Sequence, residues 1–280
     1  MVEALKTGLR ERGYVEGKNL VIEYRWAEGK YERLPDLVAE LIASKVDVIV
    51  THARAGIRAA KQATTTIPIV MASIGDPVAA GLIDNLSRPG RNVTGLSFFG
   101  REIAAKRLEM LKETLPHTTT IATLMDRSTI EPADIHALES AAKALKITVQ
   151  VADVKSVNAL ESTLSGITKS RIASVLVSET PMLISNGKAV GAIATKHRLA
   201  SIGFKDVAEG GGLMSYGADI PAMWHRAATY VDKILNGTKP GDIPVEQAAK
   251  FEMVINLKTA KALGITIPQT VLVRATRVIE

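Results

Sequence analysis

The sequence contains no cysteine and few aromatic residues. Without cysteine among its 280 residues, the protein forms no disulfide and uses no thiol for catalysis or metal binding. Aromatic residues make up 4% of the chain, so the predicted core consists mainly of Ala, Val, Ile and Leu. No apolar run reaches the ~18 residues of a membrane-spanning helix. The N-terminal stretch MVEALKTGLRERG (residues 1–13) has the pattern of an amphipathic helix rather than of a signal peptide.

The charge balance is mildly basic, and the basic residues are dispersed. Lys and Arg outnumber Asp and Glu by 35 to 29, a formal net charge of +6. Such an excess is compatible with a nucleic acid or an anionic surface as partner. The densest basic group, between Arg101 and Lys112, is interleaved with Glu102, Glu109 and Glu113, whereas a nucleic-acid footprint is clustered. The pattern favours a solvated face and predicts no nucleic-acid partner.

Strand and helix patterns alternate along most of the chain. Apolar residues make up 46% and charged residues 23% of the sequence, as in a globular protein of one or two domains. Apolar runs of strand length lie at residues 46–51, 67–72, 120–125, 148–154 and 173–178. Amphipathic helix patterns lie at residues 31–44, from Pro132 onward, and through Trp224 to Asn236 and Gly237. The alternation predicts an α/β fold in which helices cover both faces of parallel sheets.

A turn-rich segment divides this series near residue 98. The sequence SRPGRN (residues 87–92) leads into a strand pattern, NVTGLSFFG (residues 92–100), and a new strand–helix series follows. We therefore predict two similar α/β lobes rather than one continuous sheet.

Small and polar residues follow one of the buried strands. The stretch IPIVMASIGDPV (residues 67–78) runs from an apolar strand into Ser73, Gly75 and Asp76. Parallel α/β sheets bind ligands at the carboxyl ends of their strands, where small residues give a ligand access to backbone N–H groups. Asp76 would pair there with a cationic group. Alternatively, Asp76 caps a helix that has Pro77 in its first position, and the spacing alone leaves both interpretations open.

Sequence patterns of catalysis and cofactor binding are missing. The chain has no G-x-G-x-x-G, phosphate-loop or G-x-S-x-G motif, and its five histidines show no H-x-x-x-H spacing. His52 follows a strand and is the one histidine that we retain as a candidate site residue. We predict no catalytic residue, no metal and no cofactor, with a triad assembled from separate loops left open.

Five stretches in a fixed order resemble a known family. They are GLRERGYVEGKNLVIEYRWAEG (residues 8–29), IPIVMASIGDPVAAGL (67–82), RPGRNVTGLS (88–97), GGLMSYGAD (211–219) and PGDIPVEQ (240–247). Over essentially its whole length the chain is similar to bacterial substrate-binding proteins of ABC transporters, in the group related to tryptophan and tyrosine binders. The resemblance implies the type I periplasmic-binding fold, in which two doubly wound lobes enclose a ligand cleft and close about a hinge.

The resemblance also implies a function, a location and lobe boundaries. It implies binding rather than catalysis, with an amino acid or a similar small organic ligand and an ABC transporter permease as partners. The location would be periplasmic or lipid-anchored extracytoplasmic. One lobe would contain residues 1–98 and about 219–242, and the other residues 99–218 and about 243–280. The first hinge crossing would lie near Phe98.

Ligand-binding residues are implied at strand ends of both lobes. They are Thr51, His52, Ala53, Ser73, Ile74, Gly75 and Asp76 in the first lobe, and Ser178, Glu179, Ser215 and Tyr216 in the second. Glu179 would pair with a ligand ammonium, and Tyr216 would stack on a ring or lie in the hinge. The stretch His52-Ala53-Arg54 departs from the family's small residue, Thr and Pro, so Arg54 either binds a carboxylate or faces solvent.

A second departure from the family concerns the first lobe. Family members carry an export leader and a first strand, whereas this chain begins in what would be the first helix. The first lobe is therefore expected to lack a central strand and to expose unpaired backbone groups, which would favour a homodimer. A ligand-sensing regulatory core of the same fold, or an α/β enzyme that uses the cleft, stays as the alternative function.

Overall fold

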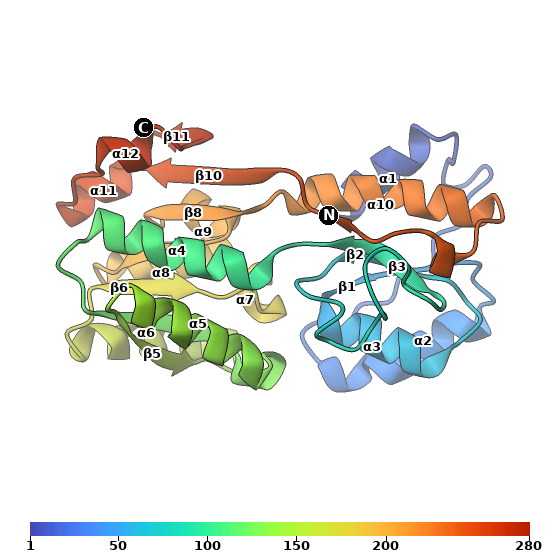
Figure 1. Cartoon of the computed structure of the whole chain (residues 1–280), viewed down its shortest axis with the longest axis horizontal. Helices are drawn as coiled ribbons and strands as arrows, with labels where there is room; N and C mark the ends of the chain where they lie inside the picture. The colour runs from blue at the N-terminus through green and yellow to red at the C-terminus, as the bar shows by residue number, and fades with distance from the viewer. The chain divides into compact units, whose positions relative to one another are not determined.

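The chain folds into two compact units, each built around its own sheet (Figure 1). The computed structural model describes residues 1–280. Unit 1 contains Met1–Gly100 and Ala218–Lys250, and unit 2 contains Arg101–Gly217 and Phe251–Glu280. The chain therefore crosses between the units after Gly100, after Gly217 and after Lys250.

Unit 1 contains a four-stranded sheet in the order β1-β2-β3-β9, with neighbouring strands parallel. Its strands are β1 (Ile49–His52), β2 (Ile69–Ser73), β3 (Val93–Ser97) and β9 (Glu246–Gln247). Its helices are α1 (Val2–Arg10), α2 (Leu34–Ala43), α3 (Ala53–Ala63) and α10 (Ile220–Leu235), with short 3-10 helices at Tyr31–Arg33 and Pro240–Asp242.

Alternate residues of β2 face two different layers of helices. Val70 and Ala72 belong to the core formed with α1 and α10, whereas Ile69 and Met71 belong to the core formed with α2 and α3. All four side chains are completely buried. A strand that is covered on both faces is apolar at every position, which is why this run predicts a strand of a two-sided parallel sheet.

Unit 2 contains a seven-stranded sheet in the order β11-β10-β8-β7-β6-β4-β5, parallel from β5 to β8. Its strands are β4 (Thr120–Met125), β5 (Thr148–Asp153), β6 (Ser174–Val177), β7 (Ala200–Gly203), β8 (Met214–Ala218), β10 (Phe251–Asn256) and β11 (Arg277–Ile279). Its helices are α4 (Gly100–Thr114), α5 (Pro132–Ala144), α6 (Leu160–Lys169), α7 (Pro181–Ser185), α8 (Gly187–Lys196), α9 (Lys205–Glu209), α11 (Leu257–Leu263) and α12 (Gln269–Leu272), with 3-10 helices at Arg127–Thr129 and Val157–Ala159.

The sheet of unit 2 is also covered on both faces. Ile121 and Met125 of β4 pack in a core with α4 and α5, whereas Ala122 and Leu124 pack in a core with α6 and α8. This arrangement confirms the predicted α/β fold with doubly wound parallel sheets. The five apolar runs correspond to β1, β2, β4, β5 and β6, and the strand pattern at residues 92–100 corresponds to β3. The first begins at Ile49 rather than at residue 46.

The third crossing lies later than the sequence predicts. Residues 243–250, expected in the second lobe, belong to unit 1. Ile243 and Val245 are buried in its two cores. The following strand β9 pairs with β3 through Leu96 and Glu246. Apolar burial and backbone pairing thus hold this segment to unit 1 until Lys250.

One edge of the unit 1 sheet is formed by β1, the first strand along the chain. Residues 21–26, between α1 and α2, belong to no strand. Within this segment Val21 is 81% exposed and Trp26 is 58% exposed. The ring of Tyr24 stacks on that of Trp26 with centroids 6.0 Å apart. Unit 1 therefore presents an unpaired strand edge and, separately, an aromatic pair in which Trp26 is exposed and Tyr24 is half-buried.

Candidate functional site

Two predicted binding segments of unit 1 lie side by side at the carboxyl edge of its sheet. His52, the last residue of β1, is aligned with Ser73, the last residue of β2, after an irregularity in the register between Thr51 and His52. Ala53 follows with a left-handed φ of 55° and begins α3. The structure therefore brings the segments 51–53 and 73–76 together, because the carboxyl ends of parallel strands share one edge.

The His52 side chain packs against Trp224 of α10. Their ring centroids are 5.5 Å apart, with a tilt of 59° between the planes. Burial lowers the pKa of the His52 imidazole below its ordinary value, because water is removed from the charged form. The ring is therefore neutral near pH 7. The indole Nε1 of Trp224 is buried without a hydrogen-bond partner, so this pair is held by packing.

The last residue of β2 and the two residues after it are buried or half-buried. Ser73 is 6% exposed and Ile74 is 4% exposed, so Ile74 serves the core, and its carbonyl accepts from the Phe98 backbone N–H at 2.8 Å. Gly75 lies beside the Phe98 ring, which would come within 3.9 Å of an added Cβ. The ring of Phe98 itself packs on the core of unit 1 formed with α10.

Asp76 caps a turn rather than a helix. Its Oδ1 accepts hydrogen bonds from the backbone N–H groups of Val78 (3.1 Å) and Ala79 (2.9 Å). The helix of the capping alternative, with Pro77 in its first position, is absent, and residues 77–81 form turns. The two hydrogen bonds support the capping interpretation of Asp76, with a turn in place of the helix. Both go to Oδ1, so Oδ2 takes no part in the cap.

The predicted binding residues of unit 2 lie after β6 and within β8, two strands of one sheet. Ser178 and Glu179 follow β6, and the Ser178 backbone N–H donates to the Leu124 carbonyl at 3.0 Å. Ser215 and Tyr216 lie in β8, from which β7 separates β6. The Ser215 hydroxyl is buried without a hydrogen-bond partner. Among these four residues, Glu179 and Tyr216 are joined by a shared contact to a fifth side chain.

That fifth side chain is Arg107 of α4, which sequence reasoning missed. Its Nη2 donates to Glu179 Oε1 at 2.8 Å, and its Nε donates to the Tyr216 carbonyl at 2.7 Å. The prediction of a solvated face for the basic group at 101–112 is wrong for Arg107, which is 2% exposed. A signal was present, because Arg107 lies on the helical stripe of Ile103 and Leu111, both buried. A basic side chain on the buried face of a helix indicates that an acidic or hydrogen-bonding partner is buried next to it.

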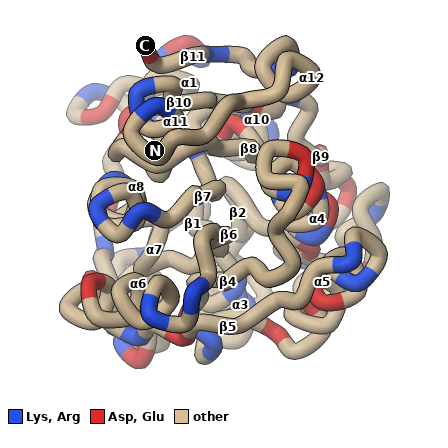
Figure 2. Tube along the Cα trace, turned by 90° about the vertical axis from the view of Figure 1, so that its left-hand side faces the viewer, with Lys and Arg blue, Asp and Glu red and all other residues tan.

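The other basic residues of α4 have local partners. Lys106 pairs with Glu109 at 2.6 Å, and Lys112 donates to the Thr118 carbonyl at 2.7 Å. Arg101 pairs with Asp134 at 2.8 Å. Figure 2 shows acidic and basic positions interspersed along the trace, which agrees with the interleaved charges of the sequence.

Tyr216 stacks on a ring of its own unit. Its ring lies parallel to that of Phe251, with centroids 6.0 Å apart and an interplanar angle of 12°. Tyr216 and Phe251 lie next to the second and third crossings. This placement corresponds to the hinge alternative for Tyr216.

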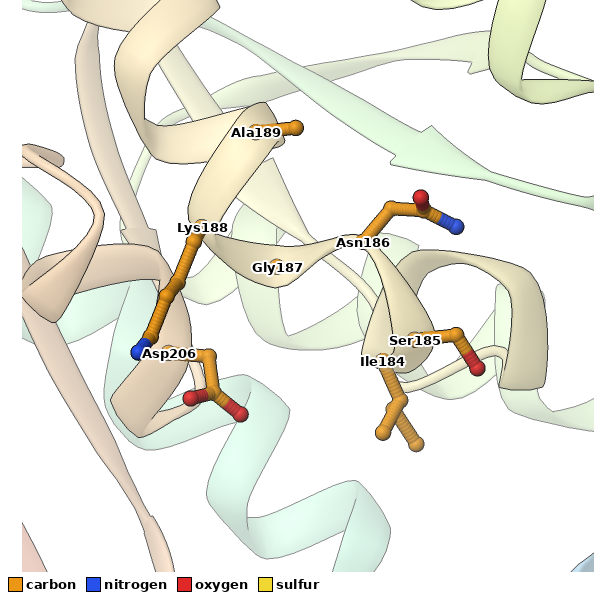
Figure 3. A pocket seen from close by; sticks show the side chains of 7 residues that line it. All are labelled: Ile184, Ser185, Asn186, Gly187, Lys188, Ala189 and Asp206. Atoms are coloured by element: carbon orange, nitrogen blue, oxygen red, sulfur yellow. The ribbon is translucent and has the colours of Figure 1, made fainter.

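A surface cavity of about 330 Å³ lies elsewhere in unit 2, at the start of α8. Figure 3 shows the Lys188 side chain extending toward Asp206 at its border. None of the predicted ligand-binding residues lines this cavity. Across residues 1–280, no three His, Asp or Glu side chains are grouped so that they could hold a metal ion. No helix of the chain is long and apolar enough to cross a membrane.

The comparison with protein families decides what kind of chain this is. The family model described as "ABC transporter substrate binding protein" matches residues 1–279. The chain belongs to this family. A tyrosine-binding protein of Clostridioides difficile is 26% identical to this substrate-binding protein over 257 residues, which cover 91% of this chain and 74% of the relative.

Solved structures of similar chains share the fold of this substrate-binding protein. A conserved domain protein of Vibrio cholerae is 30% identical, with a TM-score of 0.91. An ABC domain of Streptococcus pneumoniae, solved in complex with L-Trp, is 29% identical, with a TM-score of 0.89. Both comparisons cover 99% of this chain and 93% of the other. A leucine-binding protein of Thermotoga maritima, at 14% identity and a TM-score of 0.59, shares the type I periplasmic-binding fold.

Proposed function

We propose that this protein is the extracytoplasmic solute-binding component of an ABC transporter and that it binds an aromatic amino acid or a similar small organic ligand. The family match over residues 1–279 carries the proposal. The Trp-bound structure of a similar chain and the name of the tyrosine-binding relative support the ligand class. In this proposal the protein delivers its ligand to a permease.

The chemistry of the strand ends supports a zwitterionic ligand. Glu179, at the end of β6, offers a carboxylate to the ammonium group. Ser73 and the backbone N–H of Gly75, at the end of β2, offer donors to the carboxylate. The neutral His52 imidazole adds a polar group without a charge. In this proposal one ligand engages both sets of residues, and the three crossing segments act as the hinge.

Ligand binding is tested by thermal denaturation and calorimetry of the purified protein with L-tryptophan, L-tyrosine and L-leucine. A ligand at about 100 times its dissociation constant adds about 2.7 kcal/mol to the free energy of unfolding, so a true ligand raises the melting temperature measurably. We expect the aromatic amino acids to bind more tightly than leucine. Absence of binding by all three would contradict the proposed ligand class.

The site itself is tested by substitution. We expect Ser73→Ala and Glu179→Gln each to reduce the ligand-induced shift in melting temperature. Ser73→Ala changes the melting temperature without ligand little, whereas Glu179→Gln lowers it, because the buried guanidinium of Arg107 loses its opposite charge. Ser185→Ala, at the border of the separate cavity beside α8, is the control and leaves the shift intact. A loss of the shift in the control alone would place the ligand at that cavity instead.

A further inference from the structure

Arg107 is a charged side chain in a place where a charge is costly. It is 2% exposed and sits among the apolar side chains of α4. Removing a guanidinium from water is unfavourable unless hydrogen bonds and an opposite charge replace the lost hydration. Its two acceptors, the Glu179 carboxylate and the Tyr216 carbonyl, supply that compensation. Arg107 therefore joins α4 to the carboxyl ends of β6 and β8.

The backbone around the guanidinium leaves room for this contact. A Cβ on Gly217 would lie 3.0 Å from Arg107 Nη2 and 3.4 Å from Glu179 Oε1. The glycine thus admits the ion pair at close range, directly before the second crossing. The hydrogen bond from Nε to the Tyr216 carbonyl fixes the guanidinium independently of Glu179.

Glu179 uses only part of its carboxylate in this arrangement. Arg107 binds Oε1, and the Glu179 side chain is 16% exposed. An ionised carboxylate has about four acceptor positions, so Oε2 keeps its capacity to accept from a cationic group. Because the guanidinium is held at Oε1, it also fixes the direction in which Oε2 faces.

We propose that Arg107 is a positioning residue of the ligand site, which holds Glu179 by Oε1 so that Oε2 is presented to the ammonium group of the ligand. The inference rests on the proposed function, because it needs a ligand that carries an ammonium group. Arg107 acts through Glu179, so its removal affects ligands according to whether they have that group.

The test compares Arg107→Gln, Arg107→Lys and the wild type by calorimetry. The probes are L-tryptophan, L-tyrosine and indole-3-propionate, which lacks the ammonium group. We expect Arg107→Gln to weaken binding of the two amino acids by about tenfold or more, the scale of one charge-assisted hydrogen bond, and to change binding of indole-3-propionate by less than about twofold. Arg107→Lys restores part of the loss, because lysine supplies the charge but not the two-armed geometry.

The control is Arg277→Gln, which removes another arginine–glutamate pair of unit 2, with Glu209 at 2.6 Å. It leaves the affinity for all three probes unchanged. In the double variant Arg107→Gln/Glu179→Gln, binding of L-tryptophan is no weaker than in Glu179→Gln alone, because the two residues act as one unit. If Arg107→Gln does not fold, Arg107→Lys and Glu179→Gln are each compared with the wild type instead. Both are expected to weaken binding of the amino acids more than binding of indole-3-propionate.

Equal losses for amino acids and indole-3-propionate would overturn the inference, since they would indicate general damage to unit 2. So would additive losses in the double variant, or unchanged binding of L-tryptophan by Arg107→Gln. Failure of the wild-type protein to bind either amino acid would instead contradict the proposed function together with the inference.

Discussion

At the scale of single residues, the sequence identifies candidate polar side chains better than it identifies the residues that these side chains contact. Ser73, Asp76 and Glu179 are recognisable because small or charged residues follow apolar strands. Their contacts depend on residues far along the chain: Arg107 is 72 positions from Glu179. Such a contact follows from the packing of α4 on the sheet, and no local pattern around Glu179 encodes it.

Asp76 offers a direct test of capping against ligand binding. We expect Asp76→Ala to lower the free energy of unfolding without ligand by about 1 kcal/mol, because the backbone N–H groups of Val78 and Ala79 lose their acceptor. Asp76→Asn keeps an acceptor oxygen and costs only a few tenths of that. Urea denaturation measures both. An unchanged stability in Asp76→Ala, combined with lost ligand affinity, would assign the residue to the ligand instead.

His52 makes the stability of the protein depend on pH. Its pKa is lowered in the folded state by burial, so the unfolded chain binds the proton more readily. Lowering the pH through the ordinary value of 6.5 therefore favours unfolding. We expect the melting temperature of the wild type to fall from pH 7.5 to pH 5 more steeply than that of His52→Gln. His117→Gln, at an exposed position, keeps the wild-type slope. Identical slopes in all three proteins would refute the effect.

At the scale of elements, the sequence predicts strands that are buried on both faces and helices with a clear apolar stripe. It is less reliable where backbone pairing decides the outcome. The short strand β9 is held by β3, and this pairing moves the third crossing from about residue 242 to Lys250. Likewise, Asp-Pro after a strand predicts a helix start, yet the chain forms turns at 77–81.

The approach of β2 to β3 depends on Gly95. Its φ is +138°, and a Cβ there would lie 2.2 Å from the Met71 carbonyl oxygen and 2.6 Å from its backbone nitrogen. We expect Gly95→Ala to lower the free energy of unfolding by about 2 kcal/mol or more, since backbone atoms have to move apart. The control is Gly166→Ala in α6, where an added Cβ meets no atom within 4 Å. Gly166→Ala is expected to raise the free energy of unfolding by about 0.5–1 kcal/mol, because alanine is the better helix former. Equal effects in chemical denaturation would contradict the steric argument.

At the scale of the whole molecule, the sequence predicts two α/β units because a turn-rich segment separates two strand–helix series. The chain does divide into two such units. The sequence does not show which unit residues 243–250 join. That depends on packing against residues far away in the chain, since Ile243 and Val245 are buried in the cores of unit 1. Composition says little at this scale, because both units draw on the same aliphatic residues.

The open edge of β1 leads us to expect self-association. An edge strand offers unpaired backbone groups to another chain, and Trp26 adds exposed apolar surface in the same unit. Sedimentation velocity over a range of concentrations is expected to show a monomer–dimer equilibrium, which Trp26→Lys shifts toward monomer. Val273→Lys removes an apolar side chain that is 68% exposed in unit 2 and leaves the equilibrium unchanged. A wild-type monomer at every concentration would contradict this expectation.

The contact between Trp224 and His52 gives the protein an intrinsic optical reporter. The sequence contains only two tryptophans, and Trp26 is 58% exposed whereas Trp224 is 6% exposed. Their emission therefore separates by wavelength and by access to dissolved quenchers. Since Trp224 contacts His52, which ends β1, the blue-shifted component of the fluorescence reads out events at the tip of that strand without any attached dye.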